Sequence, residues 1–179
     1  MAAPPDFLHS AGMVPASVHA AASLPFAPTA SGPLPVAAAD APQVKHFMAQ
    51  VIAQSVTQTE PMYSTLLANA CGNVDWWLQQ PQGSVHLKMV DGQNLAGVIL
   101  IKECWNLCSL FVAPSFQRRG IGRQLMQAAI AHCRGLSPKG ALWLIAAPDA
   151  VAFYQRLGFS ERETVRPMPP GFLAMQLPL

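Results

Sequence analysis

The chain has 179 residues, a length typical of one domain, with 51% hydrophobic residues, 11% charged residues and a net charge of +2. So little positive charge argues against nucleic acid as the main partner, and sparse charge leaves apolar surface on which two copies could pair as a homodimer. No apolar run is long enough to span a bilayer, and prolines interrupt the N-terminal residues, so we expect neither a membrane span nor a signal peptide. The four cysteines lack zinc-site spacing, so we expect reduced thiols and no metal in a cytoplasmic protein.

The first 33 residues are rich in Ala, Pro and Ser, which predicts an irregular extension. The ordered domain is expected over residues 34–179. It should open with a short strand over residues 34–37 and an amphipathic helix that starts near Asp40. A second helical stretch follows Pro61, and Gly72 and Asn73 are expected to interrupt it.

The second half of the chain predicts a sheet with two further helices. Strands are expected over residues 84–90, 95–101, 105–112, 141–147 and 172–177, with another near 159–165. Helices are expected over residues 120–133 and 149–157. The fold class is therefore α/β, with a mixed, mostly antiparallel sheet of six to seven strands flanked by helices.

The strongest chemical signal is the segment from Val112 to Arg123, in which a buried strand runs into a loop and two glycines open a helix. Unpaired amides at a helix start form an anion site. Gly120 and Gly122 let the backbone approach a bulky anion and adopt positive φ. The surrounding positive charge comes from Arg118, Arg119 and Arg123. Together these residues predict a pyrophosphate cradle.

Two nucleotide-binding motifs do not fit this segment. No Gly-Lys-Ser/Thr closes it, as a P-loop requires. Leu125 stands where the dinucleotide fingerprint needs its third glycine. The remaining alternative to a pyrophosphate cradle is an ordinary helix start whose arginines are solvated and bind no ligand.

The segment from Gln117 to Gly122 resembles the Gln/Arg-x-x-Gly-x-Gly/Ala signature of the GNAT acetyltransferase superfamily. A second signature of that family is similar to the segment from Ala152 to Phe159. The strand with Leu110-Phe111-Val112-x-Pro114 also looks like the family's fourth strand.

The resemblance implies an acetyl-CoA-dependent N-acetyltransferase, with acetyl-CoA as co-substrate. The acceptor would be a primary amine of a small molecule or peptide, which attacks the thioester directly. The strands over residues 105–112 and 141–147 would splay around the pantetheine arm. The implied coenzyme-binding residues are Phe111, Val112, Gln117, Arg118, Arg119, Gly120, Ile121, Gly122 and Arg123. Tyr154 matches the tyrosine that protonates the departing thiolate.

The sequence departs from the family pattern at three positions. Ala147 replaces an asparagine, and Asn106 and Leu142 stand where two branches carry a catalytic glutamate. Without those carboxylates, a water held by Asn106, Ser109 or His86 could remove the amine proton, or the amine could arrive neutral. Trp76, Trp77 and Trp105 could line an acceptor pocket or pack in the core. A non-catalytic coenzyme A sensor is the alternative function.

Overall fold

The computed structural model describes residues 11–12, 32–56, 59–165, 168 and 170–179. The helices are α1 (Ala41–Ser55), α2 (Met62–Gln79), α3 (Ile121–Cys133) and α4 (Val151–Gln155), with 3-10 turns η1 (Ala38–Asp40), η2 (Pro114–Phe116) and η3 (Pro148–Ala150). The strands are β1 (Ala11–Gly12), β2 (Leu34–Pro35), β3 (Val85–Asp91), β4 (Asn94–Lys102), β5 (Asn106–Val112), β6 (Ala141–Ala146), β7 (Ser160–Glu161) and β8 (Leu173–Pro178).

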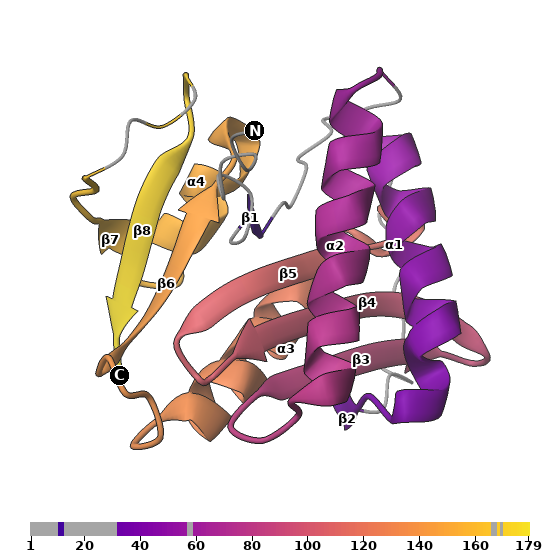
Figure 1. Ribbon diagram of the computed structural model, residues 1–179, viewed down its shortest axis with the longest axis horizontal. Coiled ribbons are helices and arrows are strands. Elements are labelled where there is room, and N and C mark those ends of the chain that lie inside the picture. The colour runs from indigo at the N-terminus through magenta and orange to yellow at the C-terminus, as the bar shows by residue number, and fades with distance from the viewer. Residues whose placement is uncertain (1–10, 13–31, 57–58, 166–167, 169) are drawn as a thin grey trace, which may run out of the picture.

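The strands form one sheet in the order β2-β3-β4-β5-β6-β8-β7, and β1 pairs with β6 outside this path. All neighbours on the path are antiparallel except β5 and β6. Short turns after β3 and β4 join these strands and β5 into an antiparallel meander. The predicted mixed, mostly antiparallel sheet is confirmed (Figure 1).

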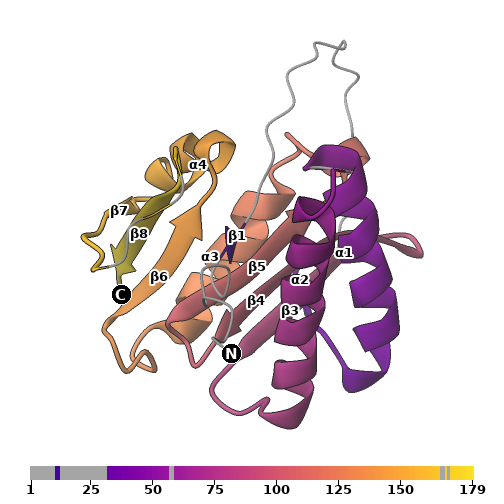
Figure 2. The same cartoon turned by 45° about the horizontal axis from the view of Figure 1, so that its top comes forward.

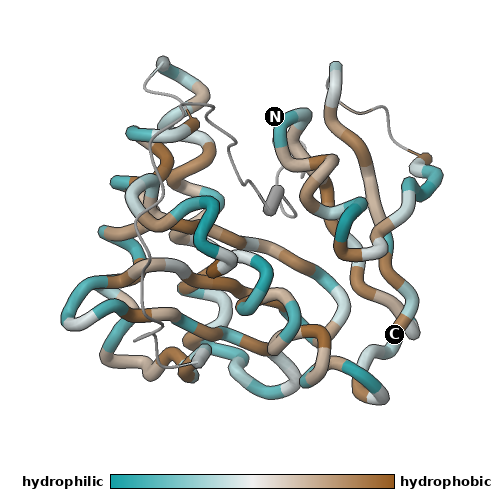
Figure 3. The backbone as a smooth tube through the Cα atoms, turned by 180° about the vertical axis from the view of Figure 1, so that it is seen from behind, coloured by the Kyte–Doolittle hydropathy of each residue, from teal (hydrophilic) through white to brown (hydrophobic). Residues whose placement is uncertain are grey.

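Helices cover both faces of the sheet and enclose two apolar clusters. One cluster joins α1 and α2 to one face, and the other joins α3 and α4 to the opposite face. Figure 2 shows α1 and α2 together in front of β3, β4 and β5, with α3 behind them. Hydrophobic residues run along the strands, while polar residues gather in the connections (Figure 3). Burial on both faces explains why β4 reads as a continuous apolar run.

Two local predictions were wrong. Helix α2 continues through Gly72 and Asn73, because a stripe of buried side chains, including Ala70 and Val74, holds it against the sheet. Such packing outweighs the cost of about 1 kcal/mol for a glycine in a helix. The alternation of apolar and polar residues over 84–90 predicts an exposed His86, but its side chain is buried because α2 places Trp77 against it, with ring centroids 4.6 Å apart.

Strands β5 and β6 are joined at one end and diverge beyond it. Their register contains the single pair Asn106 and Trp143, and the Trp143 amide donates to the Trp105 carbonyl over 2.7 Å. Beyond this junction the two strands separate (Figure 1). On its other edge β6 pairs with β8, so β1, which pairs with Ile145 and Ala146, lies on the edge of β6 that faces β5.

Candidate functional site

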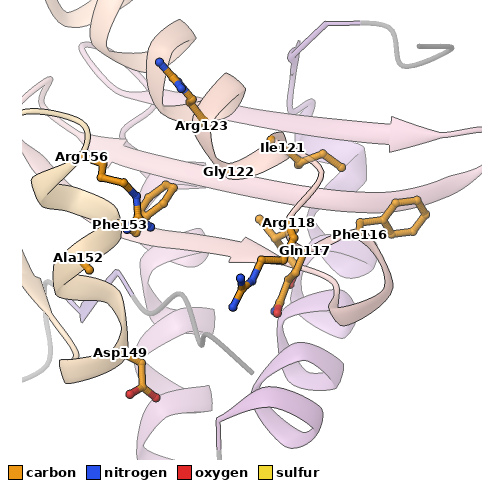
Figure 4. Close-up of a pocket in the computed structure, with 12 residues that line it drawn as sticks. Phe116, Gln117, Arg118, Ile121, Gly122, Arg123, Asp149, Ala152, Phe153 and Arg156 are labelled. Carbon is orange, nitrogen blue, oxygen red and sulfur yellow. The ribbon is translucent and has the colours of Figure 1, made fainter. Parts of the chain in front are cut away.

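A pocket of about 440 Å³ lies between the start of α3 and the segment of η3 and α4. Its volume is in the range of small-molecule sites. The lining residues are Val112, Phe116, Gln117, Arg118, Gly120, Ile121, Gly122, Arg123, Asp149, Ala152, Phe153 and Arg156. Figure 4 shows the two walls facing each other, with the α3 side and the loop before it opposite α4.

The loop before α3 has a fixed, partly strained backbone. The Gln117 side-chain amide donates to the Val112 carbonyl over 3.2 Å, which ties the loop to the end of β5. Arg118 and Gly120 have φ of 64° and 81°, both in the left-handed region. That region suits glycine, but for arginine it costs on the order of 1 kcal/mol. Strain of this kind is typical of a backbone shaped for a ligand.

The first turn of α3 presents free backbone donors to the pocket. The bond from the Gln124 amide to the Gly120 carbonyl opens the helix, so the amides just before Gln124 have no partner within it. Gly122 lies within this turn, and its φ is not positive, contrary to our prediction. It provides space instead, because a Cβ there would lie 3.5 Å from both Phe153 and Val112.

The charges that line the pocket are three arginines and one aspartate. The guanidinium groups of Arg118, Arg123 and Arg156 have no hydrogen bond or ion pair with any residue that the structure describes. Arg123 points away along α3 in Figure 4, whereas Arg156 reaches from α4 toward the pocket. Three guanidinium groups without carboxylate partners favour an anionic ligand.

Arg156 and Asp149 were not assigned to the site from the sequence. With Ala152 and Phe153 they follow the spacing i, i+3, i+4 and i+7, which places all four on one helical face. That spacing was visible in the sequence. The direction in which this face points depends on the docking of α4 on the sheet.

The structure brings seven of the predicted coenzyme-binding residues together around the pocket: Val112, Gln117, Arg118, Gly120, Ile121, Gly122 and Arg123. Phe111 is buried toward α1 and α2, outside the lining. Arg119 also lies outside the lining, with its guanidinium 5.2 Å from the ring centroid of Phe116.

Tyr154 is fully buried and does not line the pocket. It contacts Phe153 and Phe159 edge to face, with centroid distances of 5.2 and 5.5 Å. Desolvation raises the pKa of its hydroxyl well above the usual value, so the group remains protonated in the neutral range. Its neighbour Phe153 is the aromatic residue of α4 that lines the pocket.

Near the junction of β5 and β6, a bulge places polar side chains on the face covered by α1 and α2. The register between β4 and β5 shifts after the pair Leu100 and Ser109, which leaves Cys108 as the extra residue. Asn106 and Ser109 lie on this face, because their partners on β4 alternate with those that face α3. The Ser109 hydroxyl is buried without a hydrogen-bond partner among the described residues.

The remaining candidates divide between core and surface. Trp77 is buried in the core, whereas Trp76 and Trp105 are partly exposed and contact Lys102 and Trp143, respectively. Leu142 is fully buried in the cluster beside α3. Burial lowers the pKa of His86 to about 4, so its imidazole is neutral, but Trp77 covers it.

The part of the chain that the structure describes contains neither a cluster of metal ligands nor a membrane-spanning helix. There, no three or more His, Cys, Asp or Glu residues cluster as metal ligands would. None of the described helices combines the length and the apolar character needed to cross a membrane.

The family model described as "Acetyltransferase (GNAT) domain" matches residues 75–167, just over half of the chain. The matched region contains β3 to β7 and therefore the whole pocket. The chain belongs to the GNAT acetyltransferase family.

An uncharacterised N-acetyltransferase of Methanocaldococcus jannaschii is 36% identical over 76 residues, which are 41% of this chain and 32% of that protein. The chain thus matches about a third of the length of this relative.

Solved structures of similar fold include a GCN5-related N-acetyltransferase from Rhodopseudomonas palustris, with a TM-score of 0.61, 18% identity, and coverage of 89% of this chain and 100% of that one. The PaiA N-acetyltransferase of Thermoplasma acidophilum, solved with coenzyme A, has a TM-score of 0.61, 15% identity and coverage of 84% and 99%. The ribosomal-protein-S18-alanine N-acetyltransferase of Escherichia coli has a TM-score of 0.54, 24% identity and coverage of 84% and 92%. These likenesses show the fold.

Proposed function

We propose that this protein binds acetyl-CoA in the pocket between α3 and α4 and transfers the acetyl group to a primary amine. The observation that carries the proposal is the combination of free amides at the start of α3 with three arginines that lack partners among the described residues. This donor set fits a pyrophosphate, because backbone amides and guanidinium groups both favour phosphate oxygens. Family membership supports the same ligand.

The pyrophosphate would be held by the amides from Gln117 through Gly122 and by the side chain of Arg118. The pantetheine arm would follow the gap where β5 and β6 diverge, beside the backbone of Phe111 and Val112. There a fixed amide can stabilise negative charge that develops on the thioester oxygen, usually the largest contribution to acyl transfer.

When bound, acetyl-CoA supplies an acyl group activated as a thioester. In the transfer we propose, the acceptor nitrogen forms a bond to the acyl carbon as the carbon–sulfur bond breaks. Tyr154 is our candidate for donating a proton to the departing sulfur, because its buried hydroxyl is protonated at neutral pH. Asn106, with Ser109 beside it, is our candidate for holding the water that accepts the amine proton.

Two measurements test this function. Calorimetry with coenzyme A should give a 1:1 complex, and replacing Arg118 with alanine should weaken it. Incubation with acetyl-CoA and a panel of primary amines should release free thiol only when an acceptor is present. Failure of coenzyme A to bind at any attainable concentration would refute the proposal.

A non-catalytic coenzyme A sensor is the second candidate. Two observations favour it: Tyr154 lies outside the pocket lining, and Leu142 and Asn106 provide no carboxylate. A protein that binds coenzyme A tightly but acetylates no amine in a broad panel of small molecules and peptides would support the sensor.

A further inference from the structure

We propose that Arg156 recognises the 3′-phosphate of coenzyme A and makes the protein prefer coenzyme A over its 3′-dephospho form. The inference rests on the proposed function, because it takes coenzyme A as the occupant of the pocket. It assigns a role in ligand specificity to the wall formed by η3 and α4, which lies opposite the glycine-containing loop.

The pocket-facing side of η3 and α4 is polarised along its length. Asp149 stands at one end and Arg156 at the other, with Ala152 and Phe153 between them. The two charged positions are seven apart in the sequence, which corresponds to roughly 10 Å along a helix at 1.5 Å per residue. A second anionic group on the ligand is therefore attracted to the Arg156 end and repelled from the Asp149 end.

The opposite wall already contains the donors for the first anion. The free amides of α3 and the Arg118 side chain lie on that wall, and both belong to the loop and helix start. Arg156 approaches from the other side of the pocket (Figure 4). A guanidinium group at this position is placed for a second anion that is chemically separate from the pyrophosphate.

Arg156 is also free to bind such a group. No hydrogen bond or ion pair within the described residues involves its guanidinium, and the residue is exposed. Its planar fork matches the oxygens of a phosphate monoester. In coenzyme A the only monoester is the phosphate on the ribose 3′ position. Solvent screening moderates the interaction, so the expected preference is about tenfold rather than several hundredfold.

The test is a comparison of two ligands with four proteins by calorimetry at low and moderate salt. The ligands are coenzyme A and 3′-dephospho-coenzyme A. The proteins are the wild type, Arg156→Ala, Arg118→Ala and Arg134→Ala. Arg134 is the matched control, because it is an exposed arginine just after the C-terminal end of α3, away from the pocket.

The wild type should bind coenzyme A about tenfold more tightly than the dephospho form, a difference of about 1.4 kcal/mol. Arg156→Ala should abolish that preference by weakening coenzyme A alone. Arg118→Ala should weaken both ligands by a similar factor, and Arg134→Ala should change neither. Added salt should reduce the preference of the wild type.

Equal affinity of the wild type for both ligands would overturn the inference and leave the proposed function standing. The same holds if Arg156→Ala weakens both ligands equally, which would place Arg156 on the pyrophosphate. If the wild type binds neither ligand, the proposed function itself fails. The folding of each variant is checked by thermal unfolding without ligand.

Discussion

The ring of Phe153 packs over Gly122 so closely that a Cβ on that glycine would lie 3.5 Å from Cζ of the ring. Phe153 belongs to α4, and Gly122 lies in the first turn of α3, so this approach joins the two walls of the pocket. A branched side chain at position 122 would have to fill the space that the ligand needs.

Replacing Gly122 with valine should therefore weaken coenzyme A binding by at least tenfold, or about 1.4 kcal/mol. The fold should survive, because position 122 is helical and the first carbon of the side chain meets only ordinary contact distances. Calorimetry measures the affinity, and thermal unfolding confirms the fold. Unchanged affinity in a folded Gly122→Val variant would refute the proposal that the start of α3 binds the pyrophosphate.

Gly120→Val is the contrasting variant. Gly120 has φ of 81°, and a Cβ there would meet only the Gln124 side chain, at 3.9 Å. The substitution should therefore act through backbone strain and lower the free energy of unfolding by about 1–3 kcal/mol. Urea unfolding measures this loss, and a variant as stable as the wild type would contradict the assigned conformation.

Tyr154→Phe tests the proposed proton donor. The change removes only a hydroxyl and keeps the edge-to-face contacts with Phe153 and Phe159. If the hydroxyl protonates the leaving sulfur, turnover should fall about 100-fold or more. Coenzyme A affinity should change little, because the lost interaction is specific to the transition state. Near-normal turnover, with chemistry rate-limiting, would assign the proton to another donor.

The titration of His86 should make the free energy of unfolding depend on pH. Its folded pKa of about 4 lies below the ordinary value of 6.5, because burial disfavours the imidazolium form. The unfolded chain therefore binds a proton below pH 6.5 that the folded chain does not bind, so stability falls as pH drops from 6.5 toward 4. The full contribution is about 3 kcal/mol.

His86→Leu should flatten this part of the pH profile of the unfolding free energy, measured with urea. The neighbouring ion pair of Asp40 and Lys88 stays in place and serves as an internal reference, because it lowers the pKa of Asp40 and so acts at more acid pH. If the wild type and the variant lose stability in parallel between pH 6.5 and 4, the assignment of a buried, neutral imidazole to His86 is wrong.

Deletion of residues 1–31 should tighten coenzyme A binding by about fivefold, the equivalent of about one hydrogen bond. The reason is that β1 pairs with β6 on the edge facing β5, beside the gap in which we place the pantetheine arm. Titration of the full chain and of the deletion variant gives the comparison. Equal affinities would mean that β1 and the ligand do not compete.

Much of the fold could be predicted because apolar runs mark the strands of the meander, and Asp91-Gly92 marks the turn after β3. The pocket wall formed by the loop and the start of α3 was also predictable, since its two glycines and the arginines near them lie in one continuous segment. The burial of His86 and the continuity of α2 were not, because both depend on how a second layer of side chains covers the sheet.

Residues that line the opposite wall of the pocket were the hardest to predict. Arg156 lies 33 residues beyond Arg123 in the chain and reaches the pocket only after α4 docks on the sheet. The position of Tyr154 has the same origin, since the helical face that contains Arg156 and Phe153 turns Tyr154 inward.

The junction of Asn106 and Trp143 connects two halves of the sheet through one strand pair and one neighbouring backbone bond. A joint this narrow can act as a hinge, because changing the angle between the halves need not break the ladders of β3 with β4 or of β6 with β8. Such a motion would be resisted by the packed core, because one apolar cluster contains residues of both halves of the sheet. A wider angle at the hinge, such as an acyl group bulkier than acetyl would require, would therefore have to be matched by rearranged side chains in that shared cluster.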